Sequence, residues 1–151
     1  MAEIIWKNKS SKEIEGLIIT ETPPISKPKM KVNKIEIDGR DGDIVEKVGY
    51  ESYTKNIGIG LTRNFDIDEV IKYFTGEGEL VISDEPDKVY IASIYDDVDY
   101  EKLLIMRKAT VKFHVQPFKY LKDENKVSLN ITTQTSIDVT NQGLEISKPI
   151  L

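Results

Sequence analysis

Cysteine is absent from this sequence, histidine occurs once, and no apolar run approaches the length of a membrane-spanning helix. Without cysteine the chain has neither disulfide bonds nor thiol chemistry. The single histidine, His114, lies in an alternating strand-like stretch, and no Gly-x-Ser-x-Gly motif supplies a nucleophile for it. The first residues are interrupted by charge too early for a signal peptide. We therefore expect no enzyme, no catalytic residue, no signal peptide and no membrane insertion, with His114 facing outward from its strand.

Patterns that bind metals or phosphates are also missing. Asp96-Asp97-Val98-Asp99 is followed by Glu101, but it lacks the turn glycine of a calcium loop. Gly76-Glu77-Gly78-Glu79 follows a predicted helix, whereas a phosphate cradle places its glycines before one. We expect neither a metal nor a cofactor.

The charge is unevenly distributed along a chain whose net charge is -5. Residues 1–34 carry seven lysines and four acids, whereas residues 77–101 carry nine acids and one lysine. The simple interpretation of the acidic stretch is a solvated rim. The alternative is a surface that repels DNA. Sequence-specific binding of nucleic acid is not expected, because it needs a surplus of Lys and Arg on one face.

Most of the chain shows the period of two that is typical of strands. Ile57–Leu61 alternates isoleucine and leucine with glycine, and Val111–Gln116 alternates apolar with polar residues. Val89–Tyr95 is apolar on both faces, which indicates a central or covered strand. The sequence predicts an α+β fold that is mainly β: a twisted antiparallel β-sandwich or partly open barrel with one short α-helix.

The helix is predicted around Ile67–Phe74. Ile67, Val70, Ile71 and Phe74 fall on one stripe, and Asp66 is a suitable N-cap. Gly76 is placed to end the helix in the left-handed conformation. Because so short a helix is unstable alone in water, we expect its stripe to pack on a sheet.

Turn and linker signals divide the rest of the chain. Gly39-Arg40-Asp41-Gly42 supplies two glycines for unusual backbone angles, and Ser83–Asp87 forms a tight connection between strands. Pro117 is expected to end the strand Lys108–Gln116 or to place it at an edge. We predict a domain over residues 1–121, a charged linker over 122–126, and the start of a truncated second β domain over 127–151.

Several short motifs recur in an order that resembles a known family. An N-terminal strand with a tryptophan precedes a proline pair, a Gly-Arg-Asp-Gly turn, a helix leading into a Ser-Asp strand end, and a Pro-Phe strand end, followed more weakly by an Asn-x-Gly turn and a proline. These are Ile5-Trp6, Pro23-Pro24, Gly39–Gly42, Asp66–Asp87, Gln116–Tyr120, Asn141–Gly143 and Pro149. In order and spacing they resemble the N-terminal domain of the distal tail (Dit) protein family of long-tailed bacteriophages and prophages.

The resemblance implies a structural role in assembly. Members of that family form a hexameric ring around the DNA channel, joining the tail tube to the adsorption apparatus. It implies a homo-oligomer, with tail tube protein and tail-associated hub protein as partners. The implied location is the virion tail, with assembly in the host bacterial cytoplasm.

Two groups of residues are candidates for such a site. The subunit interface is predicted at the turn Gly39, Arg40, Asp41 and Gly42 and at Ile57, Ile59 and Leu61, on the assumption that their strand lies at a sheet edge. The channel-facing acids are predicted to be Asp84, Asp87, Asp96, Asp97 and Asp99.

The main alternative is a carbohydrate- or receptor-binding β-sandwich. A module of that kind would show a flat row of exposed aromatic side chains on one sheet face. Sequence alone does not separate the two hypotheses.

Overall fold

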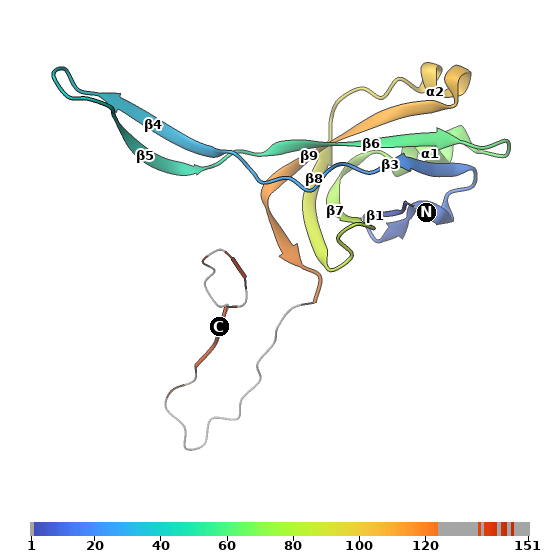
Figure 1. Ribbon diagram of the computed structural model, residues 1–151. Helices are drawn as coiled ribbons and strands as arrows, with labels where there is room; N and C mark the ends of the chain where they lie inside the picture. Colours follow the sequence, from blue (N-terminus) through green and yellow to red (C-terminus); the bar gives the residue numbers. More distant parts are fainter. Residues whose placement is uncertain (1, 124–135, 137, 142, 145, 147–151) are drawn as a thin grey trace.

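A computed structural model describes residues 2–123, 136, 138–141, 143–144 and 146 of the chain. Its strands form two antiparallel sheets of very different size (Figure 1). The elements in chain order are β1 (Ile4–Trp6), β2 (Lys9–Ser10), a 3-10 turn (Ser11–Glu13), β3 (Leu17–Glu21), β4 (Met30–Glu36), β5 (Asp43–Tyr50), β6 (Tyr53–Leu61), α1 (Ile67–Tyr73), β7 (Gly76–Ile82), β8 (Lys88–Ile94), α2 (Tyr100–Met106) and β9 (Lys108–Leu121).

The larger sheet has seven strands in the order β2-β1-β7-β8-β9-β6-β3. It curls into an antiparallel half-barrel, so the predicted class, α+β and mainly β, is confirmed. Of the long strands, β9 buries one face over residues 111–115 and leaves the other more accessible, whereas β6 is buried on both faces over residues 57–61. β8 lies between β7 and β9, as its apolar residues on both faces predict. We call this sheet with its helices the body.

Helix α1 lies beside β2, where Glu69 pairs with Lys9 at 3.1 Å. Asp66 caps the helix by accepting from the amides of Asp68 and Glu69. Val70 and Phe74 are buried as the stripe predicts, whereas Ile71 of the same stripe is 37% exposed. Phe74 meets Phe113 of β9 edge-on. Tyr73 is also buried, and its hydroxyl donates to the carbonyl of Lys9 at 2.9 Å. The short helix is therefore held by the core and not by its own hydrogen bonds.

A second short helix, α2, was not predicted from the sequence. Asp99 caps it by accepting from the amide of Lys102 at 2.8 Å, and Arg107 ends it with a φ of 57°. Its sequence carries apolar residues on all sides, so no stripe with a helical period stands out. Only Leu103 is buried among the helix residues.

The strand that contains Pro117 is longer than predicted. β9 runs through the proline to Leu121 and is paired on both sides, with β6 and with β8. The prediction that Pro117 ends the strand was wrong, whereas the alternative holds in that Pro117 has no paired residue on the β6 side. Pairing with β6 reaches only Val115, and pairing with β8 shifts register opposite Tyr90 and Ala92. Pro117 sits within that irregularity, where its missing N–H costs no ladder hydrogen bond.

The smaller sheet is a hairpin of β4 and β5 that extends away from the body (Figure 1). Met30 pairs with Tyr50 at its base and Glu36 with Asp43 near its end. We call residues 30–50 the arm and residues 36–43 the arm tip. Every residue from Lys31 to Val48 is exposed.

The predicted domain boundary is only partly accessible to the structure. The last strand of the body ends at Leu121. Residues 124–126 of the predicted linker, and nearly all of the predicted unit 127–151, lie outside the described residues. Over the described part of the chain, no helix is both long and apolar enough to span a membrane.

Candidate assembly interface

The arm tip is built on the glycine turn that the sequence analysis singled out. Gly39 and Gly42 have φ values of 83° and 82°, in the left-handed region that favours glycine. The amide of Arg40 donates to the carbonyl of Ile37 at 3.1 Å and closes the turn. A Cβ at either glycine would meet nothing within 4 Å. The turn is thus constrained by backbone angle and not by packing.

The arm exposes apolar side chains on both of its faces. Ile35 and Ile44 pair directly across the two strands and share one face, with 49% and 38% of their surface exposed. Val45 pairs with Lys34 on the other face. An isolated two-stranded hairpin is marginally stable in water, so exposed residues of this kind mark a surface that gains from a partner.

Several contacts fix the base of the arm on the body. The amide of Glu51 donates to the carbonyl of Lys29 at 2.7 Å. The ring of Tyr50 meets Phe118 of β9 edge-on at 5.2 Å. The segment entering the arm is held by Lys55, whose ammonium donates to the carbonyl of Pro24 at 3.1 Å. These contacts give the arm a defined direction of exit.

Lys55 belongs to a partly buried polar cluster near the arm base. Its residue is 2% exposed, and its ammonium lies 4.9 Å from the centre of the Tyr90 ring. Glu85 accepts from the Tyr90 hydroxyl and pairs with Lys119. Burial lowers the pKa of the Lys55 ammonium, although Glu85 opposes the change. The cluster joins β6, β8, β9 and the β7–β8 turn.

Glu85 is the acceptor that holds this cluster together. Burial raises the pKa of its carboxyl, but the hydrogen bonds from Lys119 and Tyr90 and the nearby lysine charges outweigh burial and leave the pKa below its ordinary value. Burial and Glu85 also raise the pKa of the Tyr90 hydroxyl, which stays protonated and donates. Glu85 is therefore a carboxylate at neutral pH.

The second predicted interface group lies inside the molecule. Ile57 and Ile59 are 0% exposed and Leu61 is 6% exposed, all within the hydrophobic core. Their strand, β6, is paired on both sides, with β3 and β9, so it is not a sheet edge. The edges of the large sheet are β2 and β3. These three side chains therefore contact their own chain, and the interface proposed below leaves them out.

The predicted channel-facing acids form two groups and not one. Asp84 and Asp87 lie on the β7–β8 turn, whereas Asp96, Asp97 and Asp99 lie beyond the opposite end of β8. A seven-residue strand separates the groups by roughly 20 Å. Asp87 pairs with Lys88 at 3.4 Å, and Asp99 is the cap of α2.

His114 lies on the face of β9 opposite the core, as expected, but it has close partners. Its Nε2 is 2.6 Å from a carboxylate oxygen of Asp96, and Tyr95 stacks on its ring at 3.8 Å. The hydroxyl of Thr54 is 3.4 Å from Nδ1. A hydroxyl, an imidazole and a carboxylate thus lie in line on an exposed sheet face.

This line of groups lacks the surroundings of a nucleophilic site. Two hollows of the described structure, one between β2 and α1 and one beside the arm base, include none of its residues. The Thr54 contact is also long for a hydrogen bond to a hydroxyl. Within the described residues, no group of three or more His, Cys, Asp or Glu side chains could hold a metal ion. The contacts instead fasten the segment leading into α2.

Exposed aromatic side chains do not form a free row on the described surface. Tyr95, Phe118 and Tyr120 are the exposed aromatics there. Tyr95 stacks on His114, and Phe118 packs edge-on against Tyr50. The arrangement that a carbohydrate-binding β-sandwich would show is thus not found in this part of the chain.

Helix α2 presents a surface that the sequence analysis missed. Leu104, Ile105 and Met106 are 40%, 73% and 64% exposed. Lys102, Arg107 and Lys108 flank them in the sequence and are also exposed, and the guanidinium of Arg107 lies 4.7 Å from the centre of the Phe65 ring. We call these six residues the α2 patch. The signal was present in the sequence, since residues 102–108 combine four apolar residues with three cations and no acid.

The fold resembles that of a protein of a phage adsorption apparatus. The chain aligns with the crystal structure of the SPP1 Dit (gp 19.1) protein, described as a paradigm of the hub adsorption apparatus in phages that infect Gram-positive bacteria. The TM-score is 0.62 at 15% sequence identity. The alignment covers 80% of this chain and 52% of that protein, so the chain spans about half of the length of its structural neighbour. No protein-family model and no curated protein sequence matches the chain.

Proposed function

We propose that this protein is a non-enzymatic structural component of a phage tail, built to assemble with further copies of itself. The observation that carries the proposal is the arm. A body with its own core extends a hairpin on which every residue from Lys31 to Val48 is exposed. The likeness of the fold to a hub adsorption protein supports the same role.

In its finer form, the proposal is a hexameric ring around the DNA channel. The ring joins the tail tube to the adsorption apparatus, with a tail tube protein and a tail-associated hub protein as partners. The arm tip, at Gly39–Gly42, forms part of the subunit interface. The protein works in the virion tail after assembly in the bacterial cytoplasm.

The acidic residues suit a channel that DNA crosses without binding. A backbone of phosphates is repelled by carboxylates, and the net charge of the chain is -5. If β8 runs along the ring axis, Asp84 and Asp87 face the channel at one level. Asp96, Asp97 and Asp99 then face it at another.

The proposal is tested by the size and symmetry of the assembled protein. Light scattering over a range of concentrations gives the mass, and negative-stain electron microscopy shows the shape. We expect closed rings, either from the protein alone or after co-expression with the products of the neighbouring tail genes. A stable two-fold dimer, or a monomer under both conditions, would contradict the proposal.

A variant without the arm is the matched control. Because Met30 and Tyr50 pair directly, an Asn-Gly turn in place of residues 31–49 closes the base of the hairpin. The body keeps its core in this variant, so its circular dichroism and thermal melt should match those of the full chain. Ring formation should be lost. Rings of unchanged size would show that the arm is not part of the interface.

A further inference from the structure

We propose that the arm tip of one copy docks on the α2 patch of the next copy, with acids facing cations around an apolar centre. This inference rests on the proposed ring and names the surface that receives the arm. It is argued from the charge, the exposure and the placement of the two surfaces.

The arm tip is apolar and acidic. Residues 36–43 contain Glu36, Asp38, Asp41 and Asp43 against one Arg40, a net charge of -3. Ile37 is 45% exposed within this segment, and Ile35 and Ile44 flank it on the shared face. A surface with this composition needs a partner that is apolar at its centre and basic around it.

The α2 patch has the complementary composition. Residues 102–108 contain three cations and no acid, a net charge of +3. Leu104, Ile105 and Met106 lie between these cations in sequence and point away from the core, because Leu103 alone is buried. Asp99 is occupied as the cap of the helix, whereas Glu101 is exposed one turn before Ile105, so the three cations of the patch face one neighbouring acid. A helix that is apolar on all sides is normally covered, so the exposed half of α2 lacks a partner within the described chain.

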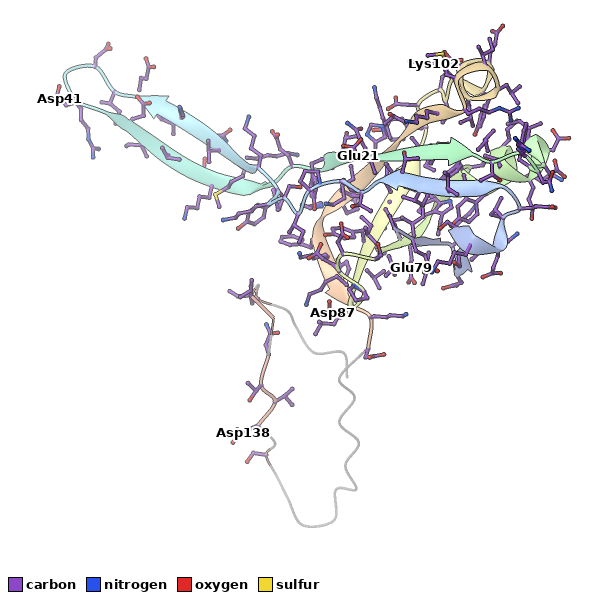
Figure 2. All side chains as sticks on the ribbon, turned by 45° about the vertical axis from the view of Figure 1, so that its right-hand side comes forward. Glu21, Asp41, Glu79, Asp87, Lys102 and Asp138 are labelled. Carbon is purple, nitrogen blue, oxygen red and sulfur yellow. The ribbon has the colours of Figure 1, made fainter. Side chains whose placement is uncertain are left out.

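The two surfaces lie on opposite sides of the same molecule. Figure 1 shows the arm leaving one side of the body and α2 near the other, and Figure 2 labels Asp41 and Lys102 at these two extremes. The contacts at the arm base direct the arm away from the body, so a chain does not cover its own α2 patch. A second copy can supply the contact.

A contact between two different surfaces of identical chains is head-to-tail. Each copy then offers a free arm and a free patch to further copies, and the series closes into a ring when the rotation per copy divides the circle. A two-fold dimer would instead require both tips to reach the opposite patches at the same time, which needs the arm tip and the α2 patch on one side of the molecule. Their placement on opposite sides therefore favours a ring over a dimer.

Introduced cysteines test this pairing directly, because the natural chain has none. Ile37→Cys and Ile105→Cys are made as separate variants, one of them with a mass tag, and are mixed and oxidised mildly. The expected product is a disulfide between the two variants, since each cysteine finds the other only across an interface. The matched control replaces Ile37→Cys by Ile25→Cys, which is 64% exposed but lies outside the arm. Its yield with Ile105→Cys should be at least about tenfold lower.

The outcomes separate this inference from the proposed function. Rings in the microscope together with a 37–105 yield no greater than the 25–105 yield would overturn the docking site and leave the proposed ring intact. A protein that forms no ring, alone or with its neighbouring tail gene products, would contradict both.

Charge reversal gives a second measurement that does not depend on disulfide geometry. Lys102→Glu with Lys108→Glu should weaken assembly by at least about tenfold, because like charges then face each other. Adding Asp38→Lys and Asp41→Lys in the same chain should restore assembly. Thermal melts of each variant report whether the monomer remains folded. Failure of the tip reversal to rescue a folded patch variant would overturn the pairing.

Discussion

The arm and the body contain the same apolar residue types, but those of the body are buried and those of the arm are exposed. Ile57 in β6 is 0% exposed, whereas Ile44 in the arm is 38% exposed although it too is paired in a strand. In the body, the apolar side chains of the strands pack against one another across the curled sheet, and Val70 of α1 and Leu103 of α2 join the same core. In the arm, two strands have no third layer to cover them.

This difference in exposure separates the residues that stabilise the single chain from those that we propose act in assembly. Burial of apolar surface, at roughly 25 cal/mol per Å², holds the body together without a partner. In the single chain the apolar side chains of the arm stay exposed, so they gain little of this burial free energy. They can contribute only when another surface covers them, so substitutions in the two regions should separate into losses of stability and losses of assembly.

The largest effect on stability is expected in the core of the body. Phe74→Ala removes a ring that is 3% exposed and contacts both Tyr73 and Phe113. The free energy of unfolding should fall by about 3–5 kcal/mol, measured by denaturant melts. Ile44→Ala in the arm is the control for loss of an apolar side chain. A loss below about 1 kcal/mol for Phe74→Ala would mean that the core tolerates the cavity.

Gly16 in the body and Gly39 in the arm extend the comparison between the two regions. Both have a left-handed backbone angle, but only Gly16 is closely surrounded by other atoms. Gly16 has a φ of 78°, and a Cβ there would lie 1.9 Å from the carbonyl oxygen of Asn64. Gly16→Ala should cost about 1–2 kcal/mol for the left-handed angle and about 1–3 kcal/mol more for overpacking. Gly39→Ala has the same angular cost and no clash.

The two variants should also differ in which part of the protein they destabilise. Gly16→Ala should lower the melting temperature of the whole domain. Gly39→Ala should change amide exchange in the arm and leave that melting temperature nearly unchanged. Equal melting temperatures for both variants would show that the close approach at Gly16 relaxes freely.

The polar cluster at the arm base should make the free energy of unfolding fall at acidic pH. The pKa of Glu85 is lowered in the folded protein, so its contribution is complete at neutral pH and is lost as the pH falls through that lowered pKa. Glu85→Gln should cost about 1–3 kcal/mol at pH 7 and flatten the loss of stability below pH ~4.5. Asp87→Asn, on the same turn with an exposed side chain, is the control. An unchanged acid profile for Glu85→Gln would contradict the assigned role.

The smallest effect on stability, with a large effect on assembly, is expected in the arm. Ile44→Ser should change the free energy of unfolding by no more than about 0.5 kcal/mol, because the side chain is exposed in the single chain. Assembly followed by light scattering should weaken clearly. Thr110→Ser, an exposed strand position of the body, should change neither. Normal assembly of the Ile44→Ser variant would show that this face of the arm is not part of the interface.

Much of the local structure was predictable from short-range chemistry. Asp66 and the stripe through Val70 and Phe74 predicted α1, because capping and helical period are local properties. The paired glycines predicted the turn at the arm tip for the same reason. α2 was missed because its apolar residues are divided between the core and the surface. Within the helix only Leu103 is buried and Tyr100 is partly buried against the core, which is too few positions to show a helical period.

The arrangement of the strands was less accessible to the sequence. Ile57–Leu61 reads as a half-buried strand wherever it lies in a sheet, and only pairing with both β3 and β9 places it in the interior. Likewise, Ile35 and Ile44 have the alternation of core strands, although nothing in the body covers them. Whether a strand becomes central, edge or arm depends on contacts between residues distant in the chain.

By itself, the sequence determined the mainly β class, the short capped helix, the glycine turn and the lack of cysteine chemistry. Each of these depends on residue type or on spacing within a few positions. The tertiary structure decided that β4 and β5 leave the body as an arm, that β6 is internal, and that the acids fall into two groups. It also placed an acidic tip and a basic helix on opposite sides, because only long-range strand pairing sets where separate segments lie in space.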